Sequence, residues 1–262
     1  MKNISPTWSL KDKLVNKEIT IGSWLTIPHQ SVVEILATAG FDWLTIDLEH
    51  AAIDISQTMN LIALIQAKGM KALVRVSKNE EVIIKRVLDA GADGVIIPTV
   101  KNAAEAKQAV EFVKYPPEGK RGVGLNRAQN YGVGFEEYKE WLNKEAIIIA
   151  QIEHIESVHN IEEILNVNGI DGIIVGPYDL SASMGMPGNY THPDVANALK
   201  LLEEKTIQLG KPLGFHVIHS DYAKVVEKIS IGYSFLAFSI DFFFLGDKAR
   251  DEMKLLKSVI NK

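Results

Sequence analysis

The sequence predicts one α/β domain, a single (β/α)8 TIM barrel, and three observations lead to this fold class. Eight apolar runs of strand length alternate with segments of helical periodicity along the chain. Glycine, one further residue and aspartate recur where a helix ends and a strand begins, at 40–42, 91–93 and 169–171. The length of 262 residues is typical of one barrel, and no linker or change of composition divides the chain.

The predicted strands begin as continuous apolar runs, as expected for a parallel sheet that is buried on both faces. They cover residues 19–27, 42–50, 71–76, 93–100, 147–154, 171–181, 212–218 and 232–240. Helices are predicted between them over residues 31–40, 56–68, 80–91, 102–115, 136–143, 157–167, 191–210 and 220–229. Residues 1–14 are expected to be an N-terminal extension, and residues 247–262 a C-terminal helix.

Residues 116–135 interrupt this alternation as a long glycine-rich loop. The segment contains five glycines, two prolines and two arginines, and it has no apolar period. Loops of this length inside a compact domain usually have a function, and we expect the same of this one.

The composition excludes several classes of function. The chain has no cysteine, which excludes disulfides, thiolate metal sites and cysteine nucleophiles. A net charge of −5 argues against nucleic-acid binding, and no apolar run approaches the roughly 18 residues of a membrane span. The N-terminus lacks the apolar stretch of a secretory signal, so a cytoplasmic enzyme acting on a small molecule is expected.

Polar side chains recur at the predicted carboxyl ends of the strands. They are His50, Arg75, Gln151, Glu153 and Asp179. The carboxyl ends of parallel strands meet on one rim, where barrel enzymes have their sites, so we expect these side chains to lie together. Two carboxylates about 4 Å apart repel by roughly 4 kcal/mol at an effective dielectric of ~20. A divalent cation between Glu153 and Asp179 would remove this repulsion.

Each of these residues, taken alone, also has a purely structural interpretation. Glu153 is compatible with a solvated strand end, Arg75 with an ion pair inside the barrel, and His50 with a loop histidine beside Asp47 and Glu49. These separate interpretations do not explain why acceptors, an arginine and a histidine all fall on the same face.

Two common barrel chemistries are disfavoured by what the sequence lacks. The segments after strands seven and eight, 216–221 and 239–244, contain no glycine, so a phosphosugar site of the usual kind is not expected. No predicted strand interior holds a lysine for a Schiff base. Metal-assisted chemistry on a small, oxygen-rich carboxylate ligand remains.

Five segments together resemble the HpcH/HpaI family of class II, metal-dependent pyruvate aldolases. They are IDLEHA (46–51), LVRV (73–76), YPPEGKRGVG (115–124), QIEH (151–154) and GPYDLSASMG (176–185). The resemblance, which extends to aldolases of 4-hydroxy-2-oxoheptanedioate and of 2-dehydro-3-deoxy sugar acids, implies a barrel of the phosphoenolpyruvate/pyruvate type. It implies reversible cleavage of a 4-hydroxy-2-oxo acid to pyruvate and an aldehyde, with Mg²⁺, Mn²⁺ or Co²⁺ bound by Glu153 and Asp179.

The same resemblance implies a role for the other candidates. Gln151 would hold the pyruvate moiety, Arg75 would stabilise the enolate oxygen, and His50 would be the base. Asp89 matches an acid that raises the basicity of that histidine, whereas the residues alone favour Asp47 for this task. Both alternatives stay open.

Two aromatic residues complete the candidate site. The backbone at Tyr178 would also bind pyruvate. The family often has alanine at this position, and we expect the tyrosine to reshape the aldehyde side of the pocket. Trp24, in the first strand, is a further candidate substrate-binding residue.

The resemblance also implies an assembly. Family members form hexamers in which the final helix is exchanged between neighbours and the glycine-rich loop reaches an adjacent site, so a homo-oligomer is expected. One alternative is another lyase of the pyruvate/acyl-CoA barrels, similar to the citrate lyase β-chain, with Lys78, Lys101 and Arg121 facing the CoA. A second alternative is a non-catalytic protein that binds an oxo acid.

Overall fold

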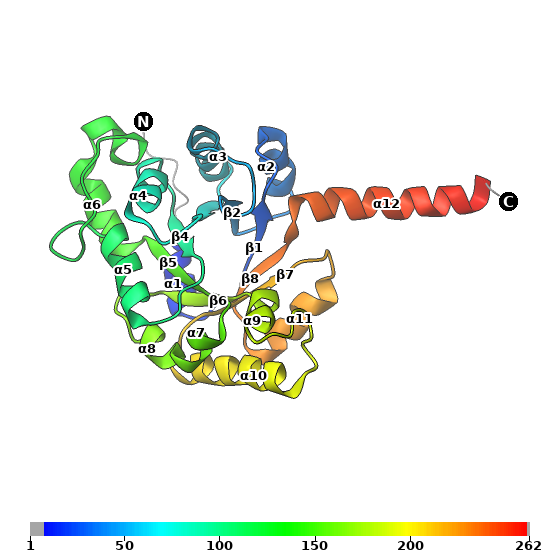
Figure 1. Cartoon of the computed structure of the whole chain (residues 1–262). Helices are drawn as coiled ribbons and strands as arrows, with labels where there is room; N and C mark the ends of the chain where they lie inside the picture. Colours follow the sequence, from blue (N-terminus) through cyan, green and yellow to red (C-terminus); the bar gives the residue numbers. More distant parts are fainter. Residues whose placement is uncertain (1–7, 261–262) are drawn as a thin grey trace.

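The computed structural model describes residues 8–260, which form a closed barrel of parallel strands surrounded by helices (Figure 1). Each strand pairs with the next one in sequence, and the last pairs with the first, so the sheet has no free edge. The strands are β1 (Thr20–Leu25), β2 (Trp43–Asp47), β3 (Lys71–Arg75), β4 (Gly94–Ile97), β5 (Ile147–Ile152), β6 (Gly172–Val175), β7 (Leu213–Val217) and β8 (Phe235–Ile240). This architecture confirms the (β/α)8 barrel that the sequence predicts.

Helices follow the strands in the expected alternation, except that the strand predicted over 171–181 ends at residue 175. Residues 177–183 are helical instead, because Pro177 begins a short helix there. The helices are α1 (Leu10–Val15), α2 (Gln30–Ala37), α3 (Ile55–Ala67), α4 (Glu81–Asp89), α5 (Ala103–Val113), the 3₁₀ helix η1 (Arg127–Gly132), α6 (Phe135–Lys144), α7 (Ile155–His159), α8 (Ile161–Leu165), α9 (Pro177–Ser183), α10 (Pro193–Gln208), α11 (Tyr222–Ile231) and α12 (Asp241–Ile260). The single crossover helix predicted over 157–167 is two short helices, because Asn160 ends α7 and its side-chain amide donates to the Lys101 carbonyl oxygen at 3.0 Å.

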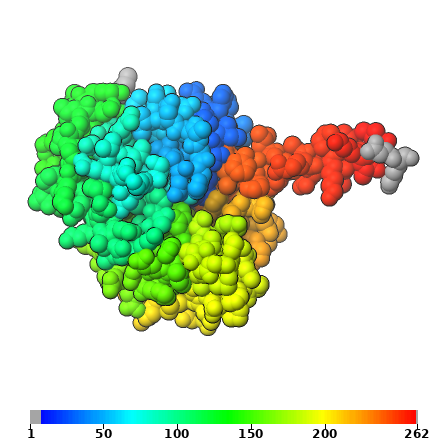
Figure 2. All heavy atoms as spheres, in the orientation of Figure 1, coloured from blue at the N-terminus to red at the C-terminus, as the bar shows by residue number. Residues whose placement is uncertain are grey.

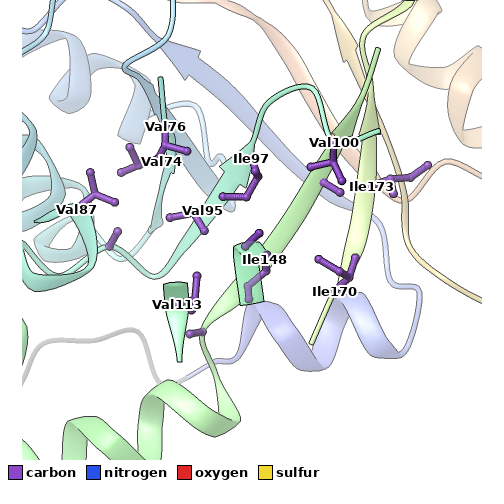
Figure 3. Packing of buried hydrophobic residues seen from close by; sticks show 14 of the residues in the cluster. Val74, Val76, Val87, Val95, Ile97, Val100, Val113, Ile148, Ile170 and Ile173 are labelled. Carbon is purple, nitrogen blue, oxygen red and sulfur yellow. The ribbon is translucent and has the colours of Figure 1, made fainter. Parts of the chain in front are cut away.

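Alternating side chains of each strand build two separate cores. Val74, Ile97 and Ile148 point outward and pack against the helices (Figure 3). Their neighbours along the strands, among them Leu73 and Ile96, point into the barrel instead. The strands are therefore buried on both faces, which explains why their sequences are continuously apolar.

The amino end of the barrel is closed by α1. Leu10 and Leu14 are 1% exposed and belong to the interior core, where Trp43 stacks on Phe235 with ring centroids 4.3 Å apart. The helix is also held by an ion pair of 2.8 Å between Lys13 and Asp42. The segment predicted as an extension thus belongs to the barrel from residue 8 onward, while residues 1–7 lie outside the described residues.

The glycine-rich segment 116–135 connects α5 to β5 and therefore lies at the amino end of the barrel, opposite the carboxyl ends of the strands. It is not irregular throughout, because η1 covers residues 127–132 and α6 begins at Phe135. Arg127 fixes it by donating to the Ala90 carbonyl oxygen at 3.0 Å and to Gln66 Oε1 at 2.8 Å. The sequence predicted a long functional loop here, but neither the helix within it nor its place at the amino end of the barrel.

The last helix, α12, leaves the barrel and projects away from it as an arm (Figures 1 and 2). It begins at residue 241 rather than 247, because the Asp241 carboxylate accepts hydrogen bonds from the amides of Thr26, Ile27 and Phe242 at 2.7–2.8 Å. Its exposed apolar side chains are Phe242, Leu245, Met253, Leu255, Leu256, Val259 and Ile260. Among residues 8–260, no helix has both the length and the apolar character that crossing a membrane requires.

Candidate active site

The carboxyl end of the barrel holds a layer of polar side chains above the apolar interior. Asp47 and Arg75 end β2 and β3, Gln151 precedes the end of β5, and Glu153 follows it. All four are buried or nearly so, although they are polar. Buried polar side chains require partners, so their contacts define what this layer can do.

Arg75 is held rigidly by a carboxylate. Its Nε and one terminal nitrogen donate to the two oxygens of Asp47 at 2.9 and 2.7 Å, a bidentate pair. Its guanidinium also lies over the ring of Trp24, 4.4 Å from the ring centroid. Burial would raise the pKa of Asp47, but the hydrogen bonds and charge of Arg75 outweigh burial and lower that pKa below its usual value. Asp47 therefore stays ionised and fixes the direction of the guanidinium.

Glu49 is a site residue that the sequence analysis mentioned only as a neighbour of His50. Its Oε2 is 3.1 Å from a terminal nitrogen of Arg75, yet this atom is buried and has no hydrogen-bond partner. The pKa of Glu49 is raised above its usual value. Burial is the main cause, and the carboxylate of Glu153 adds to it, while the charge of Arg75 opposes the increase. A buried acceptor that has an ion pair but no hydrogen bond is a position that a cation or a ligand hydroxyl can satisfy.

Glu153 is positioned by two neighbours that the sequence analysis missed. Thr99 donates to its Oε1 from both the backbone amide, at 2.8 Å, and the hydroxyl, at 2.6 Å. Thr99 has a φ of 51°, a left-handed conformation that costs energy for a β-branched residue and is common at functional sites. On the other side, Gly176 lies so close that an added Cβ would be 2.9 Å from Glu153 Oε2.

The donor set at this rim suits a hard divalent cation. Gln151 donates its amide to Glu153 Oε2, while its own Oε1 is buried and has no partner. Asp179 is exposed in the first turn of α9, three residues after Gly176. Within residues 8–260, no three His, Cys, Asp or Glu side chains are grouped to hold a metal by themselves. Two carboxylates and an amide oxygen are the ligands that Mg²⁺ and Mn²⁺ prefer, with oxygens from water or substrate filling the other positions.

His50 lies at the mouth of the barrel, and neither acid proposed for it contacts its ring. Its side chain is 70% exposed, and Nε2 is 3.8 Å from Glu49 Oε2. The contact between His50 and Asp47 is made by the backbone amide of His50, which donates to Asp47 at 3.4 Å, and not by the imidazole. Asp89 lies at the carboxyl end of α4, near the amino ends of the strands, where Arg121 donates to it at 2.6 Å. Among residues 8–260, Glu49 is therefore the acid that the imidazole approaches.

Of the three cations named for CoA, Lys78 and Lys101 follow β3 and β4 on the carboxyl side of the barrel, and Arg121 lies elsewhere. Arg121 is 1% exposed in the cluster around Asp89, so it is not a rim residue, and Lys78 pairs with Glu80 at 2.7 Å. Lys71 is buried, but it is the first residue of β3 and does not lie in the interior of the strand. It faces Asp93 at 3.7 Å, at the amino end of the barrel and far from the polar layer.

Behind Arg75, Trp24 packs against a histidine that the sequence analysis did not consider as a site residue. The rings of Trp24 and His216 are 5.3 Å apart, and His216 Nε2 is 3.1 Å from the Ser239 carbonyl oxygen. Burial is the main cause that lowers the pKa of His216 to about 3, so its imidazole is neutral in the folded protein. His216 and the guanidinium of Arg75 thus both contact the Trp24 ring, with the His216 and Trp24 rings tilted by 46°.

The neutral His216 predicts a pH dependence of stability. An unfolded histidine has a pKa near ~6.5, so below that pH the unfolded state binds a proton that the native state excludes. Between pH 7.5 and 5.5 the free energy of unfolding should fall by about 1.4 kcal/mol through this residue alone. In urea unfolding, the free energy of unfolding of His216→Gln should decrease less than that of the wild type over this pH range. His219→Gln, at an exposed position, should show the same decrease as the wild type. Parallel wild-type and His216→Gln curves would contradict the prediction.

Comparison with known proteins finds relatives over nearly the whole chain. The family model described as HpcH/HpaI aldolase/citrate lyase matches residues 20–245. A 2-keto-3-deoxy-L-rhamnonate aldolase of Escherichia coli is 35% identical over 250 residues, which is 95% of this chain and 92% of the relative. A solved HpcH/HpaI aldolase/citrate lyase family protein from Burkholderia cenocepacia is 32% identical with a TM-score of 0.89, covering 95% of this chain and 98% of that one. An HpcH/HpaI aldolase from Desulfitobacterium hafniense is also 32% identical, with a TM-score of 0.86 over 95% and 96% of the two chains.

Proposed function

This chain belongs to the HpcH/HpaI aldolase/citrate lyase family and is a carbon–carbon lyase, and we propose that it reversibly cleaves a 4-hydroxy-2-oxo acid to pyruvate and an aldehyde. The observation that carries the proposal is the bidentate Arg75–Asp47 pair, which aims a fixed positive charge into a layer that also holds Glu153 and Gln151. A fixed guanidinium in a buried site stabilises an oxyanion without reorganising during the reaction.

Each polar residue of the site has a separate role in the proposed reaction. His50 takes the proton of the C4 hydroxyl, the C3–C4 bond breaks, and the aldehyde leaves with C4. The electron pair of that bond forms the C2=C3 double bond while the carbonyl π pair moves to the keto oxygen, and Arg75 stabilises the resulting negative charge of the pyruvate enolate. A divalent cation held by Glu153 and Asp179 would supply Lewis acidity toward the same oxygen. Protonation at C3 then gives pyruvate.

For the substrate class, we propose 2-keto-3-deoxy sugar acids. The relative from Escherichia coli carries the name of an aldolase for such an acid. The citrate-lyase-like alternative has less support, since Arg121, one of the three cations named for CoA, is buried at the other end of the barrel.

Pyruvate release tests the proposed reaction. The protein, loaded in turn with Mg²⁺, Mn²⁺ and Co²⁺, should release pyruvate from one or more 2-keto-3-deoxy sugar acids, as followed with lactate dehydrogenase and NADH. Chelation should stop the release and added metal should restore it. Undiminished turnover in a metal-free preparation, or borohydride trapping of pyruvate on a lysine, would contradict the proposal.

We also propose that the enzyme is a homo-oligomer in which α12 packs on a second copy of the chain. Leu245, Met253, Leu256 and Ile260 follow one another at intervals of about one or two helical turns on one side of α12, and all four are exposed. An apolar stripe on a helix that leaves its own barrel is typical of a surface buried by a partner.

A charge placed on this stripe should disrupt the assembly. Leu256→Glu removes about 2 kcal/mol of apolar burial per copy and buries a charge, so light scattering should show a smaller species than the wild type. Lys254→Glu introduces the same charge on the other side of the helix and should leave the molar mass unaltered. A wild-type monomer at assay concentration, or an unchanged mass for Leu256→Glu, would contradict the arrangement.

A further inference from the structure

Hydrogen bonds already fill most of the acceptor positions of the Glu153 carboxylate. A carboxylate offers about four such positions, two on each oxygen. Thr99 fills both positions on Oε1, from its backbone amide at 2.8 Å and its hydroxyl at 2.6 Å. The side-chain amide of Gln151 fills one position on Oε2. Among residues 8–260 no further donor reaches this carboxylate, so the position that stays open is on Oε2.

Gly176 leaves space beside this open oxygen. An added Cβ at residue 176 would lie 2.9 Å from Glu153 Oε2, which is too close for a side chain. The φ of Gly176 is −103°, a value that other residues adopt readily, so glycine is required here for space and not for its backbone conformation. Gly176 is also the N-cap of α9, whose first turn carries Asp179. The open position of Glu153 therefore lies on the side of the other proposed metal ligand.

Thr99 is held against Glu153 by the backbone of β5. The Val100 amide donates to the Gln151 carbonyl oxygen at 3.2 Å, which ties the residue after Thr99 to the strand that precedes Glu153. The left-handed φ of 51° at Thr99 costs energy for a β-branched side chain, and glycine or asparagine would adopt it with less strain. A threonine at such a position indicates that its hydroxyl, the second donor to Oε1, has a role of its own.

A carboxylate restricted in this way distinguishes between divalent cations. Ca²⁺ takes about six to eight oxygen ligands in flexible geometry and often binds both oxygens of one carboxylate, whereas Mg²⁺ requires a near-octahedral arrangement. Mn²⁺ also suits octahedral oxygen coordination. Because both positions on Oε1 are filled by Thr99, Glu153 cannot offer both oxygens to one cation.

We propose that Thr99 is a positioning residue that restricts Glu153 to coordination through Oε2 alone, and that it thereby makes the site select Mg²⁺ or Mn²⁺ over Ca²⁺. This inference rests on the proposed metal-dependent function, in which Glu153 is a ligand. It adds the residue that sets the choice of cation and the physical reason for that choice.

Metal binding without substrate tests the inference independently of turnover. Mn²⁺ is titrated into the metal-free protein, Ca²⁺ is then added in competition, and free Mn²⁺ is measured by its EPR signal. The wild type should bind Mn²⁺ about 100-fold or more tightly than Ca²⁺. Thr99→Val retains the amide donor and the shape of the side chain but lacks the hydroxyl. Its Mn²⁺ affinity should fall about tenfold while its Ca²⁺ affinity does not fall, so the preference for Mn²⁺ should shrink about tenfold or more.

Three further variants make the comparison specific. Thr99→Ser retains the hydroxyl donor and should keep the wild-type preference. Thr99→Gly also lacks the hydroxyl but relieves the left-handed strain, so it should behave as Thr99→Val does even if the valine variant folds poorly. Thr191→Val removes the hydroxyl of an exposed threonine, which donates to Asn189 Oδ1 at 3.2 Å, and should leave both affinities unaltered.

Two results would overturn the inference while leaving the aldolase function intact. One is a wild type that binds Mn²⁺ and Ca²⁺ with equal affinity. The other is an equal loss of affinity for both cations in Thr99→Val and Thr99→Gly, as a merely structural role of the hydroxyl predicts. A wild type that binds no Mn²⁺ would instead overturn the proposed metal-dependent function, and the inference with it.

Discussion

Replacing Glu153 by glutamine is expected to weaken Mn²⁺ binding by about 100-fold or more and to remove aldol cleavage. The carboxylate receives two hydrogen bonds from Thr99, at 2.8 and 2.6 Å, so it is held with its charge directed at the rim. Glutamine retains the size of the side chain but loses the charge, and its amide NH₂ cannot accept from Thr99. Calorimetric titration with Mn²⁺ measures the affinity independently of turnover.

Two further variants make this test specific. Gly176→Ala should weaken Mn²⁺ binding as well, because its added Cβ would be 2.9 Å from Glu153 Oε2 and would displace the carboxylate. Glu156→Gln removes an exposed carboxylate three residues after Glu153 and should bind Mn²⁺ as the wild type does. Wild-type affinity in Glu153→Gln would show that this carboxylate is not a ligand.

Substitution of His50 and of Arg75 should separate two reactions that pass through the same enolate. Aldol cleavage needs a proton acceptor for the C4 hydroxyl, whereas decarboxylation of oxaloacetate has no such proton to remove. His50→Ala should therefore depress aldol cleavage by about 10²–10⁴-fold and decarboxylation much less. Arg75→Lys retains the charge but loses the planar fork that Asp47 holds, so both reactions should decrease together.

Steady-state rates of both reactions, measured in preparations of equal metal affinity, test this separation. If His50→Ala slows cleavage and decarboxylation equally, His50 is not the hydroxyl base. Glu49, whose Oε2 is 3.8 Å from the imidazole, would then be the next candidate for that role.

The barrel was predictable because its elements are locally encoded. A strand buried on both faces is apolar at every position, and a glycine that ends each of several helices marks the joint to the next strand. The start of α12 was missed for a physical reason. Asp241 is fixed by the Thr26 and Ile27 amides, more than 200 residues earlier in the chain, and no local pattern reveals that contact.

The candidate site was predictable to the extent that it consists of strand ends. Arg75, Gln151 and Glu153 were placed on one rim by topology alone, and the structure brings them into one polar layer. Thr99 was missed because its role depends on a left-handed backbone conformation, and the contact of Gly176 with Glu153 depends on the register of β5 and β6. Neither this backbone conformation nor the strand register can be predicted from a single sequence.

The closure of the amino end by α1 has a kinetic consequence. The interior below the polar layer is filled by Trp43, Phe235 and the two leucines of α1, so every small molecule enters and leaves at the opposite mouth. In the proposed reaction, pyruvate occupies the inner position at Gln151 and the aldehyde the outer one at the rim. We therefore expect the aldehyde to depart before pyruvate, and pyruvate to bind before the aldehyde in the synthetic direction, which is an ordered kinetic mechanism.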